Sequence, residues 1–183
     1  MSQPLSRWEL LVAKYAGLVT GISVATIAGF GLAGMFIATF AQSMDVSTYA
    51  LLLVLVLALI AMMTGLGLVA SVACTNRVQA LGVAMLVWFL FVLFFDLVLV
   101  GTVSNIARGA GLLGAVLLNP VEIVRVLAII QLEPDLQVLG PFGTYVLDTL
   151  GTANATTVLA SALVAWIVLP VSAAVVLFAV RAD

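Results

Sequence analysis

The sequence is 183 residues long, with 65% hydrophobic residues, 8% charged residues and a formal net charge of −2. A soluble domain of this length could not bury so much apolar surface, so the composition predicts a chain that is solvated by lipid. The lack of histidine excludes histidine-ligated haem, histidine-based metal sites and a Ser-His-Asp triad within this chain. The acidic balance argues against nucleic acid as a partner, and the single cysteine, Cys74, excludes an internal disulfide.

The first segment, residues 1–14, is charged and amphipathic, unlike most of the chain that follows. Ser6 and Glu9 have the S-x-x-E spacing of a capping box, which predicts that a helix begins at Ser6. Trp8 and Tyr15 are aromatic residues of the kind that anchor at the lipid headgroups. The segment is interpreted either as a helix that is capped where it leaves the membrane, or as a foot that rests on a soluble partner.

Long uncharged runs predict four transmembrane helices, at about residues 15–40, 49–73, 80–101 and 158–180. We therefore expect an all-α membrane protein, a polytopic helical bundle in which residues 15–183 form the transmembrane domain. Four of the six basic residues fall on one side of the predicted membrane: Arg7, Lys14, Arg77 and Arg181. By the positive-inside rule that side is cytoplasmic, and both termini lie there.

The first predicted span carries small residues at every fourth position. At helical pitch they form one ridge that another helix can approach closely, and this helix belongs either to the same chain or to a second subunit. These residues are Gly17, Gly21, Ala25, Gly29 and Ala33.

The third predicted span holds Asp96, the one ionisable residue clearly inside a predicted membrane helix. A carboxyl group at that depth is costly, which makes Asp96 a candidate functional residue. The alternative is a protonated carboxyl group that is hydrogen-bonded to a neighbouring hydroxyl or carbonyl. In the second span, Met62 and Met63 offer soft thioether ligands for copper, but such methionines also fill packing gaps.

Residues 102–157 are predicted to form an extracytoplasmic segment that contains one amphipathic helix. Asn119 caps this helix, Pro120 occupies its first turn, and Glu122 can pair with Arg125 at i, i+3. Apolar residues cover most of the circumference from there to Gln131. This pattern predicts a helix that lies in the membrane interface or dips into it.

Three stretches carry a family resemblance: residues 4–14 with P-L-S-R and a closing lysine, residues 77–96 with Gly82 and Trp88, and residues 117–125 with L-N-P-V-E. They resemble the coupling segment, the basic loop with its following helix, and the L-N-P-V-[DE] motif of the permeases of ABC-2-type transporters. Within that family they are most similar to the branch encoded with nitrous-oxide reductase, the Nos-type maturation permeases.

The resemblance implies a non-enzymatic subunit of the inner membrane, a homodimer that works with cytoplasmic ATPase subunits and a periplasmic accessory protein. ATP would be bound by the ATPase, so the chain itself would need no cofactor or metal. The cargo would be a copper- or sulfur-related species for nitrous-oxide reductase. The resemblance implies coupling to the ATPase through Ser6, Arg7, Glu9 and Lys14. It places Asp96 on the translocation path, and it implies an outer gate or periplasmic contact at Asn119, Pro120, Glu122 and Arg125.

Family members usually carry two membrane helices before the coupling segment, whereas this sequence begins at that segment. We therefore expect a shortened permease or a truncated fragment. A non-transport anchoring or assembly subunit is the first rival, and it predicts that mutations in residues 1–14 have no effect. An intramembrane enzyme is the second rival, but it would need clustered polar residues, and the spans offer only Asp96. Nothing in the sequence resembles a Walker A motif.

Overall fold

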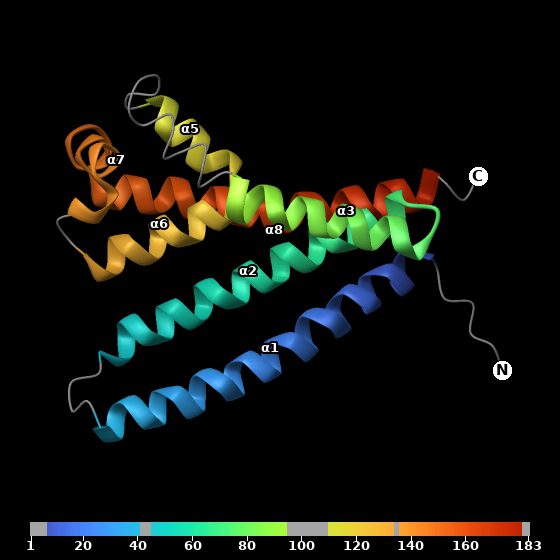
Figure 1. Cartoon of the computed structure of the whole chain (residues 1–183), viewed down its shortest axis with the longest axis horizontal. Coiled ribbons are helices and arrows are strands. Elements are labelled where there is room, and N and C mark those ends of the chain that lie inside the picture. The colour runs from blue at the N-terminus through green and yellow to red at the C-terminus, as the bar shows by residue number, and fades with distance from the viewer. Residues whose placement is uncertain (1–6, 41–44, 95–109, 134–135, 181–183) are drawn as a thin grey trace.

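Figure 1 shows the computed structural model, a bundle of long helices in which the described residues contain no β-strand. The structure describes residues 7–40, 45–94, 110–133 and 136–180. Its helices are α1 (Arg7–Phe40), α2 (Val46–Ala73), α3 (Arg77–Phe89), the π-helix η1 (Leu90–Phe94), α5 (Ala110–Leu118), α6 (Pro120–Leu132), the 3₁₀-helix η2 (Gln137–Leu139), α7 (Pro141–Tyr145), the π-helix η3 (Val146–Leu150) and α8 (Gly151–Val180).

The long helices α1, α2 and α8 are each long and apolar enough to cross a membrane. In Figure 1 the start of α1, the start of α3 and the end of α8 lie together at one end of the bundle, which we call the basal end. The end of α1, the start of α2 and the end of α6 lie at the opposite, distal end. The described start of α1 and the described end of α8 therefore lie at the same end of the bundle.

Residues 15–40 and 49–73, which the sequence predicts as spans, are helical and lie within α1 and α2. The predicted third span is helical from Arg77 to Phe94 in the part of the chain that the structure describes, and its outer end lies beyond that part.

The helix that contains the predicted fourth span begins earlier in the chain than residue 158. The apolar helical stretch that could cross a membrane runs over Phe142–Val180 instead of beginning near residue 158. Polar residues at the start of α8 are typical of a loop, but here their side chains bond to helix carbonyls. Asn154 Nδ2 donates to Leu150 O (2.9 Å), and Thr156 Oγ1 donates to Thr152 O (2.8 Å). Such local bonds satisfy polar side chains inside an apolar helix.

Side-chain caps define where α2 and α3 begin. The backbone N–H of Ser47 donates to Oδ1 of Asp45 (3.0 Å), and that of Gln79 donates to Oδ1 of Asn76 (2.8 Å). Hydrogen bonds from the hydroxyl of Thr48, and then from Ser47, lower the pKa of the Asp45 carboxyl group. Asp45 is therefore charged at the start of α2, where the helix dipole favours an anion.

Two tyrosine hydroxyls tie α1 to α2. Tyr15 donates to the carbonyl of Ala61 (2.9 Å), and Tyr49 donates to the carbonyl of Phe30 (2.7 Å). The sequence predicts Tyr15 as a headgroup anchor, and in the structure its hydroxyl is hydrogen-bonded to Ala61, well inside α2. An interhelical bond satisfies the hydroxyl where lipid offers it no partner.

The buried side chains form two clusters. The larger one joins α2, α5, α6 and α8 around the fully buried residues Ile123, Val146 and Leu159. The smaller one lies at the basal end, where Leu11 of α1 packs with Leu68 of α2 and Ala174 of α8. The first turns of α1 are therefore anchored to both other long helices.

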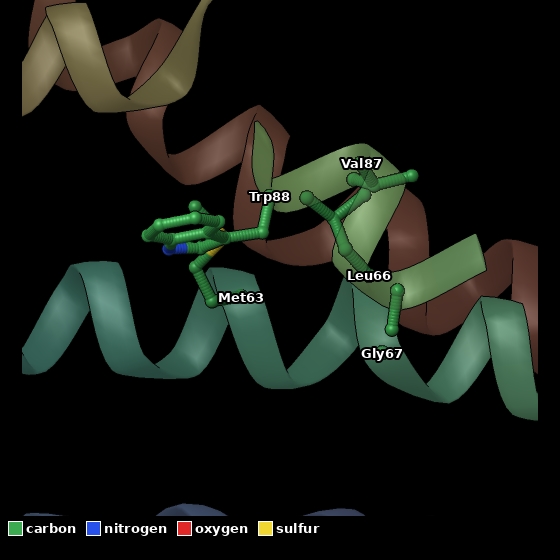
Figure 2. Close-up of a pocket in the computed structure, with 6 residues that line it drawn as sticks. Met63, Leu66, Gly67, Val87 and Trp88 are labelled. Carbon is green, nitrogen blue, oxygen red and sulfur yellow. The ribbon is translucent and has the colours of Figure 1, made fainter. Parts of the chain in front are cut away.

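A cavity of about 220 Å³ separates α2 from α3. Figure 2 shows Trp88 of α3 and Met63 of α2 among the side chains that line this cavity. Met62 is fully buried, whereas Met63 lines this cavity, so the two thioethers occupy different surroundings. Among the described residues no group of three or more Cys, Asp and Glu side chains is placed to hold a metal ion.

Gly65 lies where α2 packs closely against α8. A Cβ atom at Gly65 would lie 3.3 Å from Cγ2 of Val171 and 3.5 Å from Cβ of Pro170. We expect Gly65→Leu to destabilise the protein by about 1–3 kcal/mol through overpacking, measured as a lower Tm in detergent. Gly67→Leu is the matched control, because Gly67 has nothing within 4 Å and lines the cavity beside α3. If Gly67→Leu lowered Tm as much as Gly65→Leu, the close packing of Gly65 against α8 would not be the cause of the destabilisation.

Candidate functional site

Helices α5 and α6 form a hairpin inside the bundle. Their axes are bent by 113° at a break that contains Asn119. A bend beyond a right angle reverses the direction of the chain, so both arms point toward the distal end, as Figure 1 shows. The pair therefore forms a sharply bent hairpin, whose apex lies inside the bundle and whose two arms lead toward the distal end.

Asn119 lies at the apex of the hairpin and is fully buried. Its Oδ1 accepts the backbone N–H of Val121 (2.9 Å), which caps α6 as the sequence predicts. Its Nδ2 donates to the carbonyl oxygen of Phe91 (2.8 Å). Phe91 belongs to η1, and π-helical turns of this kind are frequent at functional sites. One side chain thus starts α6 and joins the hairpin to the helix that follows α3.

Trp166 holds the other side of the apex. Its indole Nε1 donates to the carbonyl oxygen of Leu117 at the end of α5 (3.0 Å). Its ring meets the ring of Phe91 edge to face, with centroids 5.7 Å apart and planes at 83°. Trp166 lies about halfway along α8, so the apex is held near the middle of that helix. We call Phe91, Leu117, Asn119 and Trp166 the apex clamp.

The predicted pairing of Glu122 with Arg125 is confirmed. Arg125 NH1 lies 2.8 Å from Oε1 of Glu122, with the pair at i, i+3 on α6. The Glu122 side chain is 6% exposed, whereas that of Arg125 is 49% exposed. The carboxylate of this ion pair therefore lies inside the bundle, and the guanidinium group lies nearer the surface. Pro120 beside it is buried in the first turn of α6.

The sequence pattern predicts that this helix lies in the membrane interface or dips into it. In the structure α6 does not lie on the outside of the bundle, because its residues Ile123, Val126 and Leu127 are buried in the larger core cluster with residues of α2 and α8. A helix that is apolar around most of its circumference is typically a buried one. The apex clamp allows this burial, because it satisfies the polar groups at the point where the chain turns.

The N-terminal foot is continuous with the first span. In the described residues α1 begins at Arg7, so the predicted start at Ser6 lies one residue outside them. Glu9 and Lys14 are exposed, as is Trp8, with 56% of its surface accessible. The described start of the foot, at the beginning of α1, lies at the basal end, away from the apex clamp near mid-bundle.

A family model described as "ABC-2 family transporter protein" matches residues 1–182. This chain belongs to the ABC-2 transporter family. It is also similar to "Probable ABC transporter permease protein NosY" of Stutzerimonas stutzeri, with 29% identity over 147 residues. The match covers 76% of this chain and 53% of that relative, so the chain spans about half the length of the curated relative.

The small residues of this ABC-2 family chain face outward. A Cβ atom added at Gly17, Gly21 or Gly29 would meet nothing within 4 Å, and Ala25 and Ala33 are exposed on the same helix. The interpretation in which this ridge packs against another helix of the described chain is therefore wrong. α1 contacts α2 through other residues, such as Tyr15 and Phe30.

Sequence reasoning missed three members of the apex clamp in this ABC-2 family chain. Phe91 and Leu117 contribute backbone carbonyls, which carry no residue-type signal. Trp166 did leave a signal, because an indole N–H in the middle of an apolar span needs an acceptor. The remaining predicted residue, Asp96, lies outside the described residues.

Proposed function

We propose that this chain serves as a membrane-spanning permease subunit of an ABC transporter, driven by a separate cytoplasmic ATPase. Membership in the ABC-2 family and the similarity to a probable ABC transporter permease support this proposal. In this proposal the basal end faces the cytoplasm of a cell with an inner membrane, and the chain has no enzymatic activity of its own.

One observation carries the proposed coupling: the foot and the first span are one helix. α1 runs for 34 residues from Arg7 to Phe40. Near its start, Leu11 is buried against α2 and α8, while Trp8 and Leu10 are exposed. A displacement of the exposed foot would therefore reach the long helices directly, because no loop intervenes to absorb it.

The hairpin of α5 and α6 is the proposed outer gate, and we propose that it is re-entrant. It enters from the distal end, and its apex contacts η1 and α8 through the apex clamp. The clamp bonds the hairpin to α8 on one side and to η1, which follows α3, on the other. In this proposal a shift of α8 against α3 therefore moves the hairpin. We further propose that Asp96 lies on the translocation path, and that a periplasmic accessory protein contacts the distal end.

The proposed cargo is a copper- or sulfur-related species for the maturation of nitrous-oxide reductase. Its support is the resemblance of residues 4–14, 77–96 and 117–125 to the Nos-type branch, together with the similarity to NosY. A homodimer is the proposed assembly. The outward ridge on α1, with its open space at Gly17, Gly21 and Gly29, leaves room for another helix to approach.

The coupling proposal is tested by Glu9→Lys in the complex purified from native membranes. Glu9 is exposed in the first turn of α1, so reversing its charge should leave the fold unchanged. We expect the ATPase to co-purify and hydrolyse ATP, while the ATP-driven distance change between spin labels at the distal ends of α1 and α8 falls in amplitude by roughly tenfold.

Glu133→Lys is the matched control, because Glu133 is an exposed carboxylate at the other end of the bundle. It should leave the distance change intact. Normal coupling in Glu9→Lys would remove the foot from the mechanism. Recovery of the chain without any ATPase would instead favour an anchoring subunit.

A further inference from the structure

An apolar groove of about 360 Å³ runs along the distal half of the bundle between α2, α6 and α8. Leu55 and Leu163 form part of its wall inside the core, and Val54 and Val164 are exposed beside them, at 62% and 59%. The volume falls within the range of small-molecule sites, which are mostly apolar with a few polar groups. An apolar lining offers water few hydrogen-bond partners, so the groove needs an apolar occupant.

The length of the groove matches one leaflet of a bilayer. Its lining residues on α8 run from Thr156 to Ile167, which are 11 positions apart (167 − 156). At roughly 1.5 Å per residue this distance is about 16 Å along the helix axis. A bilayer's hydrocarbon core is about 30 Å thick, so the groove spans close to half of it.

The polar lining residues lie at one end of this length. Gln131 is the second-last residue of α6, and Thr156 lies near the start of α8, so both are at the distal end. Neither carries a charge. Thr156 Oγ1 donates its proton to Thr152 O and keeps its lone pairs for another donor, and the Gln131 side chain is exposed. At the other end of the groove the lining is apolar, with Ala58 near the middle of α2 and Ile167 near the middle of α8.

We propose that this groove binds one acyl chain of a phospholipid from the leaflet at the distal end. The methylene chain lies along α8, and its ester region lies beside Gln131 and Thr156. The observation that selects a lipid over another apolar ligand is the joint match of length, polarity gradient and direction to a single leaflet. The bound chain fills the space beside α6 and thereby supports the hairpin from its outer side.

The test uses the full chain in phosphatidylcholine vesicles that contain a phosphatidylcholine with a diazirine on one acyl chain. With the diazirine at the chain terminus, we expect labelling, mapped by mass spectrometry, to concentrate near Ala58 and Ile167. With the diazirine beside the ester, labelling should move toward Gln131 and Thr156. Ala160→Trp places an indole in the groove and should lower both signals by roughly tenfold.

Ala165→Trp is the matched control, since Ala165 is exposed on the same helix and does not line the groove. It should leave the labelling unchanged. Labelling that is uniform along the exposed faces of α1 and α8, and equal in all variants, would overturn the proposal. Disulfide-linked dimers of Ala160→Cys in a Cys74→Ser background would also overturn it, because a second copy would then occupy the groove.

Discussion

Replacing Asn119 with leucine should lower the stability of the protein by about 1.5–5 kcal/mol. The variant loses the cap of α6, which contributes about 0.5–2 kcal/mol, and leaves the partly buried carbonyl of Phe91 without its side-chain donor, which costs about 1–3 kcal/mol more. For a chain of this size we expect Tm to fall by about 3–20 °C. The reaction of Cys74, the single cysteine, with a fluorescent maleimide during heating in detergent reports the transition.

Two further variants separate the contribution of the α6 cap from that of the bond to Phe91. Asn119→Ser keeps a capping oxygen but is too short to reach Phe91, so its loss should be about half of that in Asn119→Leu. Asn154→Leu removes an exposed asparagine whose bond reaches back only four residues, to Leu150 of η3, and it should change Tm little. If Asn119→Leu has the same Tm as the wild type, the apex clamp does not hold the hairpin.

Gly143→Ala should strongly destabilise the distal end. A Cβ atom at Gly143 would lie 2.2 Å from the carbonyl oxygen of Leu136, which is backbone and cannot rotate away. Leu136 is itself held at φ 49° and is almost fully buried, so it has little freedom to move. We expect a loss of about 3 kcal/mol or more, measured by the same thermal assay.

The control for Gly143→Ala is Gly114→Ala in α5. Gly114 has nothing within 4 Å of its Cβ position, so alanine there gains helix propensity without a clash. We expect Gly114→Ala to stabilise the protein by about 0.5–1 kcal/mol. A Gly143→Ala variant as stable as Gly114→Ala would mean that α7 does not pack on Leu136 as described.

Local rules account for the successful sequence predictions. The helix start at Asn119 and the pair of Glu122 with Arg125 depend on neighbours two or three positions away, so the residue types alone specify them. The late start predicted for the fourth span failed for a local reason too. The pattern of threonine and asparagine near residue 154 fits a loop as well as a helix whose polar side chains bond to its own carbonyls.

By itself the sequence determined that the chain is a helical membrane protein, because its apolar content leaves lipid as the only suitable solvent. Only the tertiary structure decided where α6 and the ridge on α1 lie. An all-round apolar helix has the same pattern on the interface and in a core, and the choice depends on contacts with Phe91 and Trp166 across 28 and 49 residues. The small residues on α1 would likewise fit against a helix of the same chain or of another subunit. The hydrogen bonds of Tyr15 and Tyr49 place other residues of α1 against α2, so the ridge faces outward.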